Sequence, residues 1–169
     1  EEEAMQSINE LREQYSDAHH VCFAYRVGPE GNSYRHSDDG EPSGTAGRPI
    51  YGQILSFGIT QVWVAVVRYF GGTKLGTGGL IDAYGTAARM ALESAGIEEL
   101  TVMHHFQMKF PMHSLHEVMD VLKRAGMEKK FLEPNTECFM EFTLSDAGIT
   151  SLNTFANREG FSIIKLFSR

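Results

Sequence analysis

Apolar and polar residues change their spacing several times along the first half of the chain. Over residues 1–16, apolar side chains recur at helical spacing between charged ones, which predicts an amphipathic surface helix. Residues 21–27 alternate instead, which predicts a strand with one face on a core. A nearly continuous apolar run at residues 62–69 predicts a central strand that is covered on both faces.

Two glycine-rich segments interrupt this periodic pattern. Residues 37–47 are rich in glycine and acid and lead into a predicted helix over residues 49–57. Residues 71–79 follow the predicted central strand and precede a second helix, which has small apolar residues on one face and ends at Gly96. We expect the working surface to be built from two segments of the N-terminal domain that overlap them, Ser37 to Thr45 and Arg68 to Tyr84.

The second half of the chain has the element order β-α-β-β-α-β. Capping and glycine signals delimit strands at residues 101–110, 129–133, 137–144 and 161–167, and helices at residues 114–125 and 146–157. This order is that of the ferredoxin-like split βαβ unit. We therefore expect a mixed α/β (α+β) protein with two domains, residues 1–98 and 99–169.

The two helices of the second domain are expected to pack on a four-stranded antiparallel sheet. Their apolar positions at helical spacing are Leu115, Val118, Met119, Leu122, Ile149, Leu152 and Phe155. Ser114 with Glu117 three residues later matches a capping box at the start of the first of these helices.

Composition and charge narrow the classes of function. The formal net charge of -7 argues against bulk attraction to nucleic acid, because such attraction relies on Lys and Arg neutralising phosphates. Residues 1–98 alone hold 7 basic and 13 acidic residues, so any nucleic-acid binding there has to be local. Two widely separated cysteines suggest a reducing, cytoplasmic setting, and no apolar run is long enough for a membrane span or a signal peptide.

The glycine-rich segment after the predicted central strand is the most informative motif. It fails the P-loop pattern, because Thr77 and Gly78 follow Gly76, and the dinucleotide pattern, because Ile81 stands in place of the third glycine. Two readings stay open: tight packing of glycines, and an anion site made by main-chain amides at a helix N-terminus. The candidate anion-binding or ligand-binding residues are Arg68, Tyr69, Gly71, Gly72, Lys74, Gly76, Thr77, Gly78, Gly79 and Tyr84.

The acidic loop offers Asp38, Asp39, Glu41 and Thr45. Its three carboxylates fit either weak Mg²⁺ binding or an acidic turn paired with Arg48 or Arg68, and we expect the paired turn. In particular, an Arg at the end of so apolar a strand needs a charged partner, so Arg68 should pair with an acid of this loop. The pattern predicts no metal site, no cofactor and no catalytic nucleophile, since zinc ligands do not converge and no nucleophile signature is present.

Several blocks together resemble the IMPACT family, and the bacterial YigZ-type branch fits best. The blocks are HHVC at residues 19–22, SDDGEPSGTAG at 37–47, VVRYFGG at 66–72, LGTGGL at 75–80 and AYG at 83–85. The resemblance covers about residues 15–95. The remainder is similar to the small C-terminal domain of bacterial members, which looks like the last domains of elongation factor G.

The resemblance implies a left-handed βαβ fold for the N-terminal domain, shared with a ribosomal protein, elongation factor G and kinases of the galactokinase type. It also implies a starting strand, which we expect to be missing from the N-terminal domain of the given sequence. Eukaryotic members regulate translation under amino-acid stress with the help of an extra N-terminal module, which is absent here. For bacterial members the family suggests a link to nucleic acid or to the ribosome.

Two classes of function follow from these observations. The first is a cytoplasmic binding protein that regulates translation through contacts with RNA, the ribosome or a translation-related protein. The second is an enzyme that acts on a phosphorylated small molecule held by the glycine-rich loop. The fold can host either function. We favour the binding protein, because the sequence shows no nucleophile paired with a base.

Overall fold

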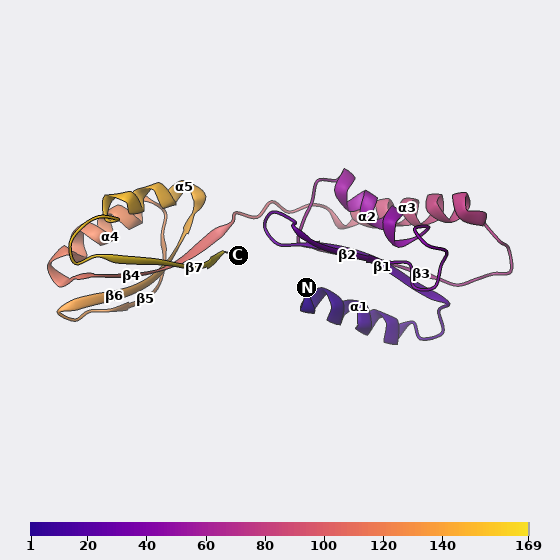
Figure 1. Cartoon of the computed structure of the whole chain (residues 1–169), viewed down its shortest axis with the longest axis horizontal. Helices are drawn as coiled ribbons and strands as arrows, with labels where there is room; N and C mark the ends of the chain where they lie inside the picture. The colour runs from indigo at the N-terminus through magenta and orange to yellow at the C-terminus, as the bar shows by residue number, and fades with distance from the viewer. Residues whose placement is uncertain (169) are drawn as a thin grey trace. The chain divides into compact units, whose positions relative to one another are not determined.

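The chain forms two compact units, Glu1–Glu98 and Glu99–Arg169 (Figure 1). The computed structural model describes residues 1–168, with the side chains of residues 129–132 and 167–168 excepted. Each unit consists of one small antiparallel sheet with helices, so the expected mixed α/β class is confirmed. Within residues 1–168, no helix is long and apolar enough to cross a membrane.

The first unit has a three-stranded sheet in the order β2-β1-β3. Its elements in chain order are α1 (Glu2–Gln14), β1 (His20–Val27), β2 (Ser33–Ser37), α2 (Gly47–Ser56), β3 (Val62–Arg68) and α3 (Gly76–Ala95). Both β2 and β3 run antiparallel to β1, so they are parallel to each other and α2 forms the crossover between them. The left-handed sense of this unit stays a prediction.

Helices cover both faces of this sheet (Figure 1). α2 and α3 pack on one face, where Cys22 and Ala24 of β1 join the core. α1 packs on the other face, where Ile8 meets Phe23 and Tyr25 of β1. Each alternating set of β1 side chains therefore enters a different core.

The prediction of β3 as the central strand was wrong. In the sheet formed by the described residues, β1 occupies the centre and β3 an edge. β1 was expected to bury one face, because its alternate side chains are small or polar. Because Cys22 and Ala24 are small, α2 and α3 pack closely on that face of the sheet, and β1 is buried on both faces. Strand β2 was not predicted at all, since its sequence SYRHS carries no apolar period.

The second unit has the order β5-β6-β4-β7, with all pairs antiparallel. Its strands are β4 (Met103–Pro111), β5 (Glu128–Glu133), β6 (Glu137–Ser145) and β7 (Ser162–Ser168). The helical segments are η1 (Met112–Ser114), α4 (Leu115–Arg124), α5 (Asp146–Ile149) and η2 (Thr150–Thr154). The predicted β-α-β-β-α-β order is thus confirmed, while the likeness to elongation factor G stays a prediction.

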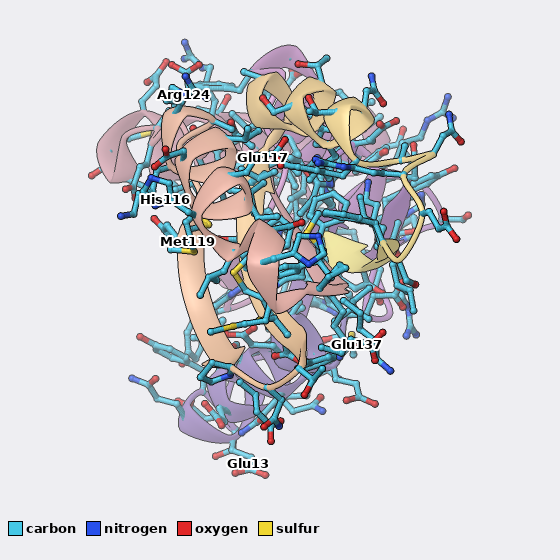
Figure 2. All side chains as sticks on the ribbon, turned by 90° about the vertical axis from the view of Figure 1, so that its left-hand side faces the viewer. Glu13, His116, Glu117, Met119, Arg124 and Glu137 are labelled. Carbon is cyan, nitrogen blue, oxygen red and sulfur yellow. The ribbon has the colours of Figure 1, made fainter. Side chains whose placement is uncertain are left out.

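The predicted core of the second unit is also confirmed. Val118, Leu122, Leu152 and Phe155 are buried against the sheet, and the other predicted positions, Leu115, Met119 and Ile149, pack beside them partly buried. α4 turns its charged side outward, and Glu117 and Arg124 stand on it (Figure 2).

Two local expectations for the second unit were wrong. The helix expected over residues 146–157 is a single α-turn followed by a 3₁₀ segment. The capping box does not form: Ser114 is buried and makes no side-chain cap bond. Instead, the Glu117 carboxylate accepts a hydrogen bond of 2.7 Å from Arg158.

Candidate functional site

The acidic loop between β2 and α2 is folded around the carboxylate of Asp38. Its two oxygens accept hydrogen bonds from the backbone N–H groups of Gly44 (2.8 Å), Ala46 (3.0 Å) and Gly47 (2.8 Å). Partial burial acts to raise the pKa of Asp38, but these amide hydrogen bonds outweigh it and the pKa is lowered. Asp38 therefore holds the loop and the start of α2 as a charged cap.

Glu41 is the most buried acid of the loop, with 4% of its side chain exposed. Its carboxylate accepts hydrogen bonds from the Arg68 guanidinium and from the Tyr84 hydroxyl, the latter at 2.8 Å. His20 Nε2 lies 3.7 Å from the same carboxylate oxygen. Burial acts to raise the pKa of Glu41, yet the hydrogen bonds from Tyr84 and Arg68 lower it. The predicted pairing of Arg68 with this loop is confirmed.

The buried Cys22 thiol contacts Tyr84 and so joins the residues around Glu41. Its Sγ donates to the Asp38 backbone carbonyl at 2.9 Å and lies 3.4 Å from the Tyr84 hydroxyl. Burial raises the pKa of Cys22 to about 12 and also raises that of Tyr84, so both groups are neutral at physiological pH. We call His20, Cys22, Glu41, Arg68 and Tyr84 the Glu41 cluster. Since a thiolate is the reactive form of cysteine, Cys22 is not an activated nucleophile.

Asp39 ties the acidic loop to β1 and α1. It adopts a left-handed backbone angle, φ 44°. One oxygen accepts the Val21 N–H at 2.6 Å, and the other pairs with Arg12 at 2.7 Å. All three loop carboxylates are therefore satisfied within the protein, whereas Arg48, the alternative partner considered from sequence, forms no ion pair among the described side chains. Thr45 donates to the Pro42 carbonyl at 2.7 Å.

The Mg²⁺ alternative considered for the acidic loop finds no support in this arrangement. Among the described residues, no group of three or more His, Cys, Asp or Glu side chains is arranged to hold a metal ion. The neighbouring histidines have other partners: His20 Nδ1 contacts the Asp39 carbonyl at 2.8 Å, and His19 Nδ1 accepts the Phe70 N–H at 3.3 Å.

The glycine-rich loop joins β3 to α3 and is exposed to solvent. A side chain added at Gly71, Gly72, Gly76 or Gly78 would meet no atom within 4 Å, so close packing does not explain these glycines. Gly72 and Gly76 have φ angles of 90° and 73°, which favour glycine for conformational reasons. Gly79 is the packed one, with Leu75 Cβ 3.1 Å from an added Cβ. Close packing therefore explains the glycine at position 79 and not those at the other four positions.

Exposed apolar and basic side chains surround this loop. Tyr69 is 51% exposed and its hydroxyl donates to Asp17 at 2.8 Å, while Phe70 and Leu75 are also exposed. The Arg68 guanidinium lies 5.6 Å from the centre of the Phe70 ring. Lys74 is exposed and forms no ion pair among the described side chains. The loop therefore combines exposed glycines, exposed aromatic rings and the cationic side chain of Lys74.

The structure brings part of the predicted site together directly. Arg68 and Tyr84 of the predicted ligand set meet Glu41 of the predicted acidic set in the Glu41 cluster. Because Arg68 pairs with His20 in the β1–β3 register, the cluster lies at the base of the glycine-rich loop. The remaining ligand candidates form the exposed part: Tyr69, Gly71, Gly72 and Lys74 in the loop, and Gly76, Thr77, Gly78 and Gly79 in the first turn of α3.

Sequence reasoning missed the participation of His20, Cys22 and Arg12. His20 and Cys22 lie two positions apart in β1 and so share a strand face, which was the available signal. No sequence signal indicated the ion pair of Arg12 with Asp39, because 27 positions separate them.

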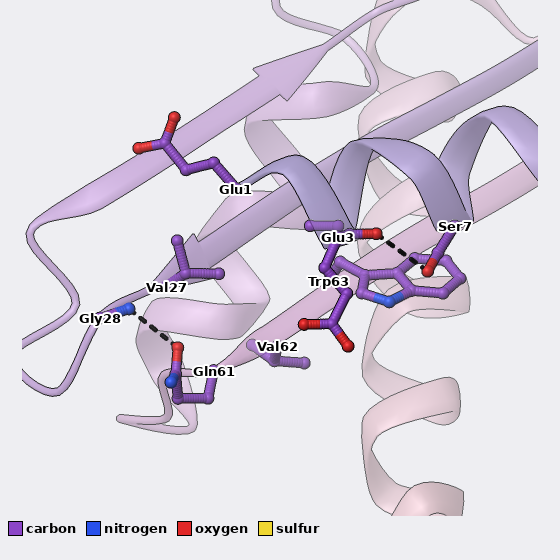
Figure 3. Close-up of a pocket in the computed structure, with 9 residues that line it drawn as sticks. Glu1, Glu3, Ser7, Val27, Gly28, Gln61, Val62 and Trp63 are labelled. Atoms are coloured by element: carbon purple, nitrogen blue, oxygen red, sulfur yellow. Dashed lines mark hydrogen bonds between the residues drawn. The ribbon is translucent and has the colours of Figure 1, made fainter. Parts of the chain in front are cut away.

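A separate cavity of about 440 Å³ opens beside the start of α1 (Figure 3). Glu3 and Ser7 of α1, Val27 of β1 and Trp63 of β3 contribute to its lining. At its edge the Gly28 N–H donates to the side chain of Gln61 at 2.8 Å. Its described lining contains none of the predicted site residues.

Comparison with known proteins places these features in a family. The family model for the Impact N-terminal domain matches residues 1–92. The chain is 37% identical over 116 residues to IMPACT family member YigZ of Escherichia coli, covering 68% of this chain and 57% of that protein. It is 42% identical over 128 residues to an IMPACT family member of Thermus thermophilus, covering 76% of this chain and 68% of that one.

A solved structure extends the similarity to the second unit. A crystal structure described as that of a hypothetical protein matches with a TM-score of 0.70 and 28% identity, covering 99% of this chain and 84% of the other. The chain spans little more than half the length of its Escherichia coli relative. From the match over residues 1–92 and the identity to these relatives, the chain belongs to the IMPACT family.

Proposed function

We propose that this protein is a cytoplasmic binding module that regulates translation, under stress in particular, by contacting RNA through the glycine-rich loop and the start of α3. One observation carries the proposal: the glycines at 71, 72, 76 and 78 are open to solvent and lie beside exposed Tyr69, Phe70 and Lys74. Ribosomal RNA is the form in which translation offers such a ligand most abundantly.

The chemistry of the loop fits a single-stranded nucleic acid. The first N–H groups of a helix have no partner within the helix and carry a partial positive charge, so they suit a phosphate. Lys74 adds a cationic side chain directly before this helix. Exposed aromatic rings such as Tyr69 offer stacking surfaces that accept any base.

The Glu41 cluster supports this surface from beneath. Arg68 ends β3 and is fixed by Glu41, with 19% of its side chain exposed. Tyr84 joins the same carboxylate from α3, so both ends of the loop are attached to one buried group. Preorganisation of this kind reduces the entropy lost when a ligand binds. The cluster is a positioning device, and the loop makes the contacts.

The charge of the first unit limits the expected affinity for RNA. The surplus of acidic residues in the first unit repels polyanions at long range, whereas the loop attracts a phosphate at contact distance. Binding should therefore be modest in affinity and sensitive to salt.

The second candidate function is an enzyme that acts on a phosphorylated small molecule. The same open first turn of α3 favours it, because that turn can hold a single phosphate group. Against it, Cys22 is neutral and the carboxylates of Asp38, Asp39 and Glu41 are all engaged inside the protein. A general base or nucleophile needs a group that is free to react.

Titration of labelled single-stranded RNA tests the proposal, using the wild type and Lys74→Glu. Lys123→Glu serves as the matched control, since Lys123 is also exposed and lies in the second unit. We expect Lys74→Glu to abolish binding and the control to retain it. Calorimetry with a panel of nucleotide phosphates is run beside it. Saturable heat of binding with one small phosphate, and no binding of RNA, would favour the enzyme. If Lys74→Glu binds RNA and small phosphates as well as the wild type does, the glycine-rich loop is not the binding site.

A further inference from the structure

A second exposed aromatic surface lies on the opposite edge of the sheet from the glycine-rich loop. Tyr34 of β2 and Tyr51 of α2 stack with ring centres 4.9 Å apart and an angle of 17° between the planes. The His36 ring lies 6.0 Å from that of Tyr51. Since β2 and β3 flank β1, this surface and the loop after β3 belong to different edges. We call Tyr34, His36, Arg48 and Tyr51 the Tyr34 platform.

Local geometry gathers these four side chains on one side. Tyr34 and His36 are two positions apart in a strand, so they point to the same face of the sheet. Arg48 and Tyr51 are three positions apart in α2, so they are neighbours on the helix surface. The contacts of Tyr51 with both rings of β2 join the two elements.

The fold accounts for Tyr51, which packs against the core of the first unit, but not for Tyr34. Tyr34 is 57% exposed and lies outside the buried core. The stack covers one face of its ring, so the exposed surface lies on the opposite face and on the ring edge. A large aromatic ring left open in this way is typical of a recognition surface.

The charge of the platform is positive within an acidic unit. Arg48 is exposed and pairs with none of the described carboxylates, because those of the neighbouring acidic loop are engaged by Arg12, Arg68 and backbone amides. The His36 ring borders the Tyr51 ring in the same platform. A flat π-face on a surface that also carries a guanidinium unpaired with any described carboxylate matches a planar base attached to a phosphate.

We propose that the Tyr34 platform is a second contact for single-stranded RNA, with one base stacked on Tyr34 and a phosphate held by Arg48. This inference rests on the proposed RNA-binding function and adds a site that is distinct from the glycine-rich loop. A strand that reaches both edges of the sheet gains affinity from two modest sites.

The test compares the binding of two labelled probes to the full chain: a single-stranded oligouridine and an abasic ribose-phosphate strand of equal length. Tyr34→Ala should weaken oligouridine binding about tenfold, since stacking on an aromatic ring contributes roughly 1–3 kcal/mol per base. It should leave abasic-strand binding unchanged, and Tyr34→Phe should restore oligouridine binding. Arg48→Gln should weaken the binding of both strands.

Arg35→Gln is the matched control. Arg35 is exposed and adjacent to Tyr34, but it points to the opposite face of the sheet, opposite Tyr25 of β1 in the register. Its substitution should leave both affinities as in the wild type. Because these side chains are exposed, the circular dichroism of all variants should match that of the wild type.

The outcomes separate this inference from the function it rests on. Unchanged oligouridine binding by Tyr34→Ala, with binding lost in Lys74→Glu, overturns the platform and leaves the loop. The reverse pattern supports the platform and overturns the loop. Failure of the wild type to bind either strand overturns both. Loss of a captured protein partner in Tyr34→Ala, with RNA binding intact, would make the platform a protein interface and overturn its assignment to RNA.

Discussion

Replacing Glu41 by Gln tests whether the Glu41 cluster holds the first unit together. The substitution keeps the volume and an acceptor for the Tyr84 hydroxyl, but it removes the charge that faces Arg68. Arg68 would then be a mostly buried guanidinium without a charged partner. Removing one member of a buried ion pair costs about 3–5 kcal/mol, because the remaining charge stays desolvated.

The expected loss lies at the lower end of this range. Arg68 retains 19% exposure, so water reaches part of the guanidinium and softens the penalty. We expect the free energy of unfolding to fall by about 3 kcal/mol. With a urea m-value of about 2 kcal/mol per M, the unfolding midpoint should drop by about 1.5 M.

Tryptophan fluorescence during urea unfolding reports on this unit alone, because Trp63 of β3 is the single tryptophan of the chain. Glu13→Gln is the control, since Glu13 is exposed on α1 and should shift stability by less than about 0.5 kcal/mol. The double variant Glu41→Gln with Arg68→Gln should recover part of the loss. A loss below about 1 kcal/mol in Glu41→Gln would refute the reasoning, because Arg68 would then be solvated adequately without its partner.

Three further predictions follow from the packing and the pKa shifts. Leu122→Ala should lower the stability of the second unit by about 2–5 kcal/mol, because Leu122 is 0% exposed; circular dichroism during urea unfolding measures it. Gly47→Ala should lower the free energy of unfolding of the first unit by about 1–3 kcal/mol, because an added Cβ would lie 2.7 Å from the Ser37 backbone. Gly78→Ala should leave this free energy unchanged or raise it, because an added Cβ there meets no atom within 4 Å. Trp63 fluorescence during urea unfolding compares the two variants. The neutral Cys22 thiol should contribute stability that is complete below its unfolded pKa of about 8.5 and is lost as pH rises toward the folded pKa of about 12. Cys22→Ala should therefore show a flatter loss of stability on the alkaline side, and an equally steep loss would contradict the assignment.

Local signals in the sequence predicted the order of elements and the core of the second unit. Periodic apolar residues and a glycine after α4 define its elements, and Gly126 adopts the expected left-handed angle, φ 75°. The β-α-β-β-α-β order then leaves few topologies. After β6 the structure has one α-turn and a 3₁₀ segment where a single helix was expected. The spacing of apolar residues alone does not distinguish these two forms of helix.

In the first unit, local sequence signals were not sufficient to predict every element and contact. A polar edge strand such as β2 has no apolar period, so only pairing with β1 reveals it. The Arg68–Glu41 pair could be predicted, because a charge at the end of an apolar strand demands a partner. The roles of Cys22 and Tyr84 could not, since 62 positions separate them and only the packing of α3 on β1 brings them together.

The salt dependence of RNA binding tests the central claim most directly. For the wild type, the logarithm of the association constant should fall linearly with the logarithm of the salt concentration. If Lys74 contacts a phosphate, Lys74→Gln should reduce the magnitude of this slope by about one and weaken binding to different sequences alike. Lys123→Gln should leave the slope unchanged. A slope in Lys74→Gln equal to that of the wild type would contradict phosphate binding by the glycine-rich loop.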